Sequence, residues 1–184
     1  KVIAWDVCPA NIILNYLAQR EQLEYDIDGK IASTGEIITD LLYELNNLKY
    51  YLSLPPKSLA REWLEIEMLP VIKKYYHYPT KDLLRTLVEH IAIQVFVNFK
   101  KSIKNKIFIT GGGALNSFLI KRLKYYMGDA IYIPDRLIIK YKEAVIFAYL
   151  GLLRWFNYPN VLSSVTGATR DSCGGAVYNS KSLE

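Results

Sequence analysis

The sequence predicts a single α/β domain in which helices flank a mostly parallel sheet. Short apolar runs alternate with longer segments whose apolar residues recur at helical spacing. The run at residues 106–109 is followed by three glycines and then by a helical pattern, which is typical of a strand–turn–helix unit. With 184 residues, 51% of them apolar and 22% charged, the chain has the size and composition of one globular domain.

Each strand is predicted from a short apolar run, and each helix from apolar residues on one face. Strands are expected at residues 2–5, 106–109 and 130–133. Helices are expected at residues 10–20, 37–48, 58–68, 80–100, 116–126 and 142–156. Ser58 and Thr80 are the expected N-caps of the third and fourth helices. The last helix is apolar on most of its sides, so we expect it to lie buried between neighbours.

Residues 25–31 alternate in polarity around Asp28 and Gly29, which favours a hairpin-type turn. A calcium loop in the same place would lack its bidentate acid, because position 12 would be Gly35. His77 and His90 have no Cys or His partner at metal-ligand spacing, so we expect both to be structural.

Composition argues against several classes of protein. The two cysteines, Cys8 and Cys173, cannot form a disulfide framework or a four-cysteine zinc site, and they fit a reducing, cytoplasmic compartment. Both lie in candidate site loops and could approach each other, although free, buried thiols are the expected state. The apolar stretch 144–156 is interrupted by Arg154 and is too short to span a membrane. The chain begins with Lys1 directly before a predicted strand, which favours a fragment of a longer protein.

The net charge of +5 permits an anionic ligand but does not require one. Lys121, Arg122 and Lys124 form a basic helix face beside Tyr125 and Tyr126. We interpret this face as a solvated surface, and a nucleic-acid patch is the alternative.

Three loops could carry chemistry, because ligands of open α/β sheets bind where strands end and helices begin. Asp6 follows the first predicted strand and could act as a general base or hold a metal through water, and the alternative is a cap for the next helix. Gly111, Gly112 and Gly113 precede a helix, which favours close approach of a phosphate-bearing ligand, with a purely structural turn as the alternative. Residues 163–170 combine hydroxyl groups, glycine and one arginine, and either an anion or sugar site or a solvent loop fits them.

Six sequence blocks, taken in order, resemble those of one known family. D-V-C-P-A-N at 6–11 resembles the family's D-T-G-P-A/G-N, and Y-D-I-D-G at 25–29 resembles its Y-D-x-D-G. P-P-K-S-L-A-R-E at 55–62 resembles P-P-K-S-x-G-R-E, and G-G-G-A-L-N at 111–116 resembles G-G-G-A-x-N. E-A at 143–144 falls where the family has an E-A pair that opens a buried helix, and S-V-T-G-A-T-R at 164–170 resembles S-V-T-G-A-x-R. The family is that of the anhydro-N-acetylmuramic acid kinases, in the sugar-kinase, heat-shock-protein and actin superfamily.

The resemblance implies that residues 1–184 form one domain, most of the second (C-terminal) lobe of a two-lobed sugar kinase. Its fold would be a ribonuclease H-like, actin-like ATPase lobe without its first strands. The implied cofactors are ATP and Mg²⁺. In the implied reaction water opens the 1,6-anhydro ring of anhydro-N-acetylmuramic acid, and the sugar is phosphorylated to N-acetylmuramic acid 6-phosphate for cell-wall recycling.

The same resemblance assigns roles to individual residues. Asp6 would be the catalytic base, Gly111, Gly112, Gly113 and Asn116 would bind the nucleotide, and Asn11 and Glu143 would bind the sugar. The intact protein would be a cytoplasmic homodimer, with neither nucleic acid nor a membrane as a partner.

Three departures from the family pattern bear on activity. Val7 and Cys8 replace Thr-Gly beside the base, Ala60 replaces Gly, and Lys140 stands in a stretch where the family has an acid. A catalytically degenerate sugar- or nucleotide-binding module of the same fold is therefore the alternative. The family's G-T-S-M-D-G phosphate loop and N-x-G-G segment are absent from the sequence, so this chain alone is predicted not to transfer phosphate.

Overall fold

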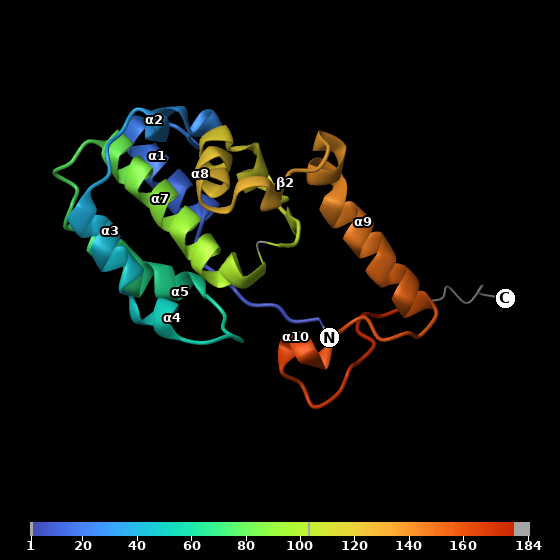
Figure 1. Cartoon of the computed structure of the whole chain (residues 1–184). Helices are drawn as coiled ribbons and strands as arrows, with labels where there is room; N and C mark the ends of the chain where they lie inside the picture. The colour runs from blue at the N-terminus through green and yellow to red at the C-terminus, as the bar shows by residue number, and fades with distance from the viewer. Residues whose placement is uncertain (1, 103, 179–184) are drawn as a thin grey trace.

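The computed structural model describes residues 2–102 and 104–178, and it is mostly helical (Figure 1). Its α-helices are α1 (Asn11–Ala18), α2 (Lys30–Ser33), α3 (Thr39–Asn46), α4 (Lys49–Leu52), α5 (Arg61–Trp63), α6 (Leu69–Lys73), α7 (Thr80–Phe99), α8 (Ser117–Met127), α9 (Arg136–Trp155) and α10 (Ser163–Thr166). A π-helix, Leu64–Met68, joins α5 to α6. Two short strands, β1 (Ile107–Phe108) and β2 (Ile131–Tyr132), pair in parallel, with Ile107 opposite Ile131.

Helix α7 is the centre of a body formed by α1 to α8. Helices α1, α2, α3 and α8 pack against it (Figure 1). The apolar residues of α7 cover a broad face, as expected for a helix surrounded by others. Fully buried core side chains include Ile13, Leu17, Leu41, Leu45, Met68, Ile72, Leu83, Leu84, Leu87 and Val88. The core therefore lies between helices, and the β1–β2 pair lies beside α8 at its edge.

The α/β class with a parallel strand pair is confirmed, but the expectation of a central sheet is wrong for the described residues. The runs at 106–109 and 130–133 form β1 and β2, as expected. Residues 2–5 form no strand, and Val2 and Ile3 are exposed. A strand needs a neighbour for its N–H and C=O groups, and within the described part of the chain none lies beside this segment.

The expected helices form, with two corrections at their starts. Thr80 is the first residue of α7, and Pro79 occupies the N-cap position. Helix α5 begins at Arg61, so Ser58 does not cap it. The hairpin-type turn at residues 25–31 is also wrong, because a 3-10 turn (Ile27–Gly29) leads directly into α2 without flanking strands.

Helix α9 begins earlier than expected, where the Asp135 carboxylate accepts a hydrogen bond of 2.7 Å from the Leu137 N–H. The expectation that it lies buried is wrong, because Ile139 is its only buried residue. Among the residues that the structure describes, no helix has both the length and the hydropathy required to cross a membrane.

A buried ionic cluster joins α7 to α8. The Glu89 carboxylate accepts hydrogen bonds from Arg85 at 2.6 Å and from two nitrogens of Arg122 at 2.8 Å, and the Tyr126 hydroxyl donates to it as well. Burial by itself would raise the pKa of Glu89, but the hydrogen bonds from Arg122, Arg85 and Tyr126 outweigh it and lower that pKa to about 2. Arg122 therefore does not belong to a solvated basic face, which corrects the interpretation from the sequence.

A second buried polar cluster joins α7 to α3 and α4. His90 Nδ1 lies 2.8 Å from Asn46 Oδ1, and its Nε2 lies 3.0 Å from the Tyr51 hydroxyl. Burial lowers the pKa of His90 to about 3, so the ring is neutral at pH 7. The amide oxygen of Asn46 can only accept, so Nδ1 carries the proton and Nε2 accepts from Tyr51. The structural role expected for His90 is confirmed.

Candidate functional site

Asp6 lies in an extended segment before α1, and its carboxylate is held by the loop that precedes α5. Its Oδ2 accepts hydrogen bonds from the Leu59 N–H at 2.7 Å and from Ser58 Oγ at 3.2 Å. Its backbone N–H donates to the Lys57 C=O at 3.0 Å, and its C=O accepts from the Tyr50 hydroxyl at 2.6 Å. The side chain is exposed, yet both the backbone and one carboxylate oxygen are fixed in position.

The other carboxylate oxygen, Oδ1, accepts no hydrogen bond from the described residues and is free to accept a proton. Asp6 is also not a helix cap, because Ala10 occupies the N-cap position of α1 and no side chain caps that helix. The capping alternative for Asp6 is therefore wrong.

A hollow of about 430 Å³, which we call the Asp6 hollow, opens beside this carboxylate. Three separate segments line it, and its residues are Ala4, Trp5, Asp6, Pro56, Lys57, Ser58, Val165, Thr166 and Gly167. The blocks at 6–11, 55–62 and 164–170 thus meet at one place, although 100 residues and more separate the first from the last. A carboxylate, hydroxyl groups and one ammonium group face the same space, which suits a polar ligand rich in hydroxyl groups.

Lys57 is the one cation among the described residues that line this hollow. Its Nζ donates to the Tyr50 C=O at 3.0 Å and lies 4.4 Å from the centre of the Tyr50 ring. Burial lowers the pKa of Lys57, and burial together with the negative charge of Asp6 raises the pKa of Tyr50 to about 12. Tyr50 is therefore protonated at neutral pH, and its hydroxyl donates a hydrogen bond to the backbone C=O of Asp6.

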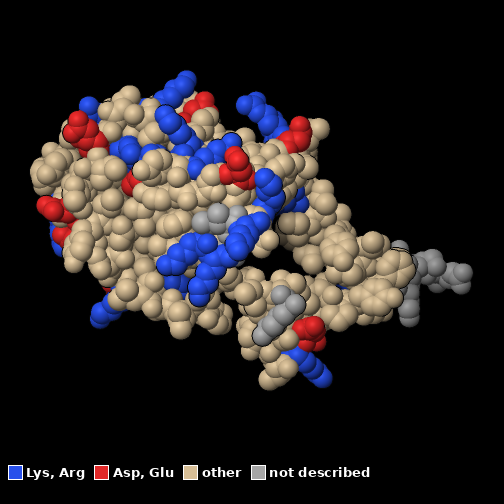
Figure 2. Space-filling view, in the orientation of Figure 1, with Lys and Arg blue, Asp and Glu red and all other residues tan. Residues whose placement is uncertain are grey.

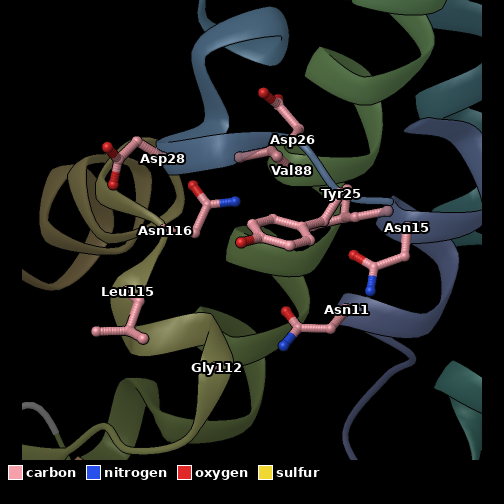
Figure 3. A pocket seen from close by; sticks show the side chains of 10 residues that line it. Asn11, Asn15, Tyr25, Asp26, Asp28, Val88, Gly112, Leu115 and Asn116 are labelled. Carbon is pink, nitrogen blue, oxygen red and sulfur yellow. The ribbon is translucent and has the colours of Figure 1, made fainter. Parts of the chain in front are cut away.

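A second hollow, of about 280 Å³, lies between α1 and the start of α8, and we call it the Asn11 hollow (Figure 3). Its lining includes Asn11, Asn15, Tyr25, Asp28, Gly112 and Asn116. Figure 3 shows the Tyr25 ring across the middle of the hollow, with the amides of Asn15 and Asn116 on either side. Three amides and an aromatic ring can hold a flat polar ring system, and no Lys or Arg is among the lining residues that the structure describes.

The glycine loop is shaped by Asn11. A β-carbon at Gly112 would lie 2.8 Å from Asn11 Nδ2, so a larger residue there would require the Asn11 amide to move. Gly111 has φ +80°, a conformation that glycine adopts without strain. Packing and backbone geometry therefore explain two of the three glycines without a ligand, and they support the structural-turn alternative for Gly111 and Gly112.

The Y-D-x-D-G block positions the start of α8. Both carboxylate oxygens of Asp26 accept backbone hydrogen bonds of 2.9 Å, from Ile31 and Ala32, so Asp26 caps α2. Gly29 has φ +68°, and a β-carbon there would lie 2.5 Å from Asn116 Oδ1. This block brings Asp28 close enough to accept a hydrogen bond of 3.2 Å from the hydroxyl of Ser117.

Asn116 and Glu143 were both expected to bind ligands, but they do not lie together in one site. The Asn116 side-chain oxygen accepts from the Leu119 N–H at 3.0 Å and caps α8, which leaves its amide nitrogen toward the Asn11 hollow. Glu143 is exposed on α9 and lines neither hollow. Asp6 and the glycine loop line different hollows, and residues 6–11 run from one hollow to the other.

The two cysteines lie in different surroundings. Cys8 is partly buried, and this burial raises the pKa of its thiol to about 12, against the opposing effect of Lys57. Cys173 is exposed, and its sulfur lies 3.7 Å from a nitrogen of Arg154. Both cysteines are free, so the expectation of free thiols is confirmed, although only Cys8 has limited exposure.

Comparison with known proteins decides which family the chain belongs to. Residues 1–180 match the sequence model of the family described as anhydro-N-acetylmuramic acid kinase. The chain belongs to this family. The resemblance of the six blocks is thereby confirmed, and the chain is part of a kinase family.

Curated anhydro-N-acetylmuramic acid kinases from three bacteria illustrate the similarity. The protein of Microcystis aeruginosa is 29% identical over 192 residues, that of Hydrogenovibrio crunogenus 32% over 190, and that of Sulfurimonas denitrificans 33% over 187. The alignments cover 97%, 97% and 95% of this chain, and 50% of each relative. The chain thus spans about half the length of the curated relatives it matches, and its assignment as one domain in the second lobe stays a prediction.

Sequence reasoning missed the residues that hold Asp6. Tyr50, Lys57 and Ser58 received no role in the site, although the P-P-K-S block was among those that resembled the kinase family. That block carried the signal for Lys57 and Ser58. Tyr50 had no local signal, because its contact with Asp6 spans 44 residues.

Proposed function

We propose that the intact protein is an ATP-dependent kinase of 1,6-anhydro-N-acetylmuramic acid, and that this chain supplies its catalytic base and its nucleoside-binding part. The proposal includes opening of the anhydro ring and formation of N-acetylmuramic acid 6-phosphate in cell-wall recycling. It rests on family membership and on one observation above all. Three sequence blocks that resemble the kinase family meet at the Asp6 hollow, around a carboxylate whose orientation is fixed.

In this proposal Asp6 is the base that activates water. Its Oδ2 is engaged by Leu59 and Ser58, so Oδ1 receives the proton of the water molecule that attacks the anomeric carbon. The bond between that carbon and the bridging oxygen breaks, and the same oxygen then takes the phosphoryl group. The Asp6 hollow holds the sugar, whose hydroxyl groups find partners in Ser58 and Thr166.

The Asn11 hollow fits the nucleoside part of ATP. Its volume of about 280 Å³ is near the lower limit for ligand sites, and its amides and Tyr25 suit a base and a ribose. None of its described lining residues is cationic, and in this proposal another segment of the intact protein supplies the groups that bind the triphosphate. ATP supplies the phosphoryl group when bound.

The two hollows lie within reach of one sugar–nucleotide pair. Five residue steps separate Asp6 from Asn11, and a fully extended chain of that length spans at most about 18 Å. In this proposal Mg²⁺ is bound together with the nucleotide. Within the described residues no three potential ligands among His, Cys, Asp and Glu lie together, and Mg²⁺ is commonly held by one or two carboxylates plus substrate phosphates.

A degenerate module that binds sugar or nucleotide without catalysis is the second candidate. It is favoured by Val7 and Cys8 beside the base, because Cys8 is partly buried and its thiol stays protonated. The cytoplasmic location and the homodimeric assembly of the intact protein also stay predictions.

The substitution Asp6→Asn in the intact protein tests the proposal. Loss of a general base typically costs 10²- to 10⁴-fold, so we expect kcat to fall by about 1,000-fold while ATP affinity, measured by calorimetry, is unchanged. Asp129→Asn is the matched control, because Asp129 is exposed and its side chain makes no hydrogen bond with the described residues. ADP release within tenfold of the parent rate by the Asp6 variant would refute the role of Asp6.

Calorimetry of the parent protein separates the two candidates. Binding of the anhydro sugar without any ADP release would favour the degenerate module. The isolated 184-residue chain is expected to release no ADP, and turnover comparable to the intact protein would contradict that expectation.

A further inference from the structure

Helix α9 is the least covered apolar element of the structure. Its side chains Leu137, Val145, Phe147 and Trp155 are each 66–71% exposed, and Tyr141, Tyr149 and Leu152 are more than half exposed. In Figure 1 this helix stands apart from the body formed by α1 to α8. In Figure 2 the lower half of α9 presents an uncharged surface on the face shown. A helix that is apolar on all sides normally lies in the interior of a protein.

The β1–β2 pair is incomplete in the same region of the molecule. Its inner side chain Ile131 is buried, whereas Phe108 and Tyr132 lie side by side on the outer face, each at least half exposed, with ring centres 5.7 Å apart. Parallel strands are normally covered on both faces, and a pair of strands is not stable by itself. Two uncovered apolar regions thus follow each other along the chain, the outer face of the pair and helix α9, and we call them together the α9 surface.

The amount of exposed area favours a large occupant. A compact monomer of 21.2 kDa exposes about 9,100 Å², whereas this chain exposes 12514 Å², an excess of about 3,400 Å². A standard interface between two proteins buries only about 800 Å² of each partner. The excess, which also includes exposed segments outside α9, is several times larger than one such interface.

We propose that the remaining half of the intact polypeptide covers the α9 surface, extending the β1–β2 pair and packing along α9. The chain spans about half the length of its relatives, so a segment of sufficient size exists in proteins of this family. This inference concerns assembly of the fold and does not depend on the proposed kinase activity. A second copy of the chain is the competing occupant.

Two substitutions in the intact protein test the proposal. Phe147 in α9 and Tyr43 in α3 are both 71% exposed in this structure. If the α9 surface is covered, Phe147→Asp places a charge in an apolar contact and lowers Tm by about 5 °C or more. Tyr43→Asp keeps its charge in water and changes Tm by less than about 2 °C. Equal shifts for the two variants would overturn the proposal.

Hydrogen exchange of the unsubstituted intact protein gives a second measurement that does not depend on how the variants fold. We expect the amides of α9 to exchange within about tenfold of the rate of the α7 amides, at all protein concentrations. Faster exchange in α9 would overturn the proposal. Protection that disappears on dilution, together with dissociation of a dimer in light scattering, would assign the surface to a second copy and would also overturn it.

Discussion

The ionic cluster around Glu89 leads to a quantitative prediction for Glu89→Gln. The substitution preserves the shape of the side chain but removes the charge that Arg85 and Arg122 contact in a nearly water-free environment. The pKa of Glu89 is lowered from 4.5 to about 2, and a shift of this size corresponds to about 3 kcal/mol of stability at pH 7. We therefore expect the free energy of unfolding to fall by about 3 kcal/mol at pH 7, measured by urea unfolding of the chain.

The sharper test is how the difference in free energy of unfolding between the parent and Glu89→Gln depends on pH. A carboxyl group with a lowered pKa in the folded state stabilises the fold fully above its unfolded pKa, and this contribution is lost as pH falls toward the folded pKa. The difference between parent and variant should thus be constant above about pH 5, roughly half as large at pH 3, and absent below about pH 2. A difference that is the same at pH 7 and pH 3 would refute the reasoning.

Glu65→Gln is the matched control for Glu89→Gln. Glu65 pairs with Arg61 at the same i, i+4 spacing as Glu89 with Arg85, but the side chains of that pair are 53% and 78% exposed. Exposed pairs of this kind contribute about 0.3–0.5 kcal/mol. Equal losses for Glu65→Gln and Glu89→Gln would show that burial of the Glu89 cluster has no energetic consequence.

Two further predictions concern the site and the turn beside it. Ser58→Ala in the intact protein should lower kcat about fivefold with KM unchanged, because one hydrogen bond to Asp6 of about 1 kcal/mol is lost while the bond from the Leu59 N–H remains. The control is Ser33→Ala, which removes an exposed hydroxyl on α2. Equal effects of the two substitutions on kcat would contradict the role of Ser58. Gly29→Ala should lower the free energy of unfolding by about 3 kcal/mol or more, since a β-carbon there overlaps Asn116 and the backbone is left-handed. Gly167 has a left-handed backbone too but open space around it, so Gly167→Ala should lower the free energy of unfolding, measured in urea, by only about 1–2 kcal/mol. Similar losses for the two variants would argue against the overlap at Gly29.

Local patterns were sufficient to predict the elements whose stability is local. The segment 80–100 gave α7 almost to the residue, because its length and apolar spacing leave no competing structure. The runs at 106–109 and 130–133 gave β1 and β2. Residues 2–5 have an equally apolar pattern and form no strand, because a strand is completed by its neighbour and not by its own sequence.

The candidate site shows the same division between local and distant information. The block at 6–11 contains Asp6 and Asn11, so their nearness to a ligand could be proposed from the sequence alone. The hydrogen bonds that hold Asp6 come from Tyr50, Ser58 and Leu59, which lie more than 40 residues away in the sequence. No local sequence pattern predicts these contacts. The sequence predicted a hairpin-type turn around Asp28 and Gly29, whereas the Asp26 carboxylate accepts hydrogen bonds from two backbone N–H groups of α2.

Helix α9 was expected to be buried, and it is exposed in this structure although its side chains are mostly apolar. Its residues predicted burial on most sides, and the structure leaves all but Ile139 at least partly exposed. The hydrophobic effect acts on the side chains whichever segment covers them, and the exposed apolar residues of α9 are the reason for our proposal that another segment covers this helix. A similar argument applies to the proposed role of Asp6, because a site that excludes bulk water strengthens the electrostatic interactions of a catalytic carboxylate. Covering the α9 surface and closing the Asp6 hollow are therefore two separate requirements, and a protein that satisfied only the first would be stable and inactive.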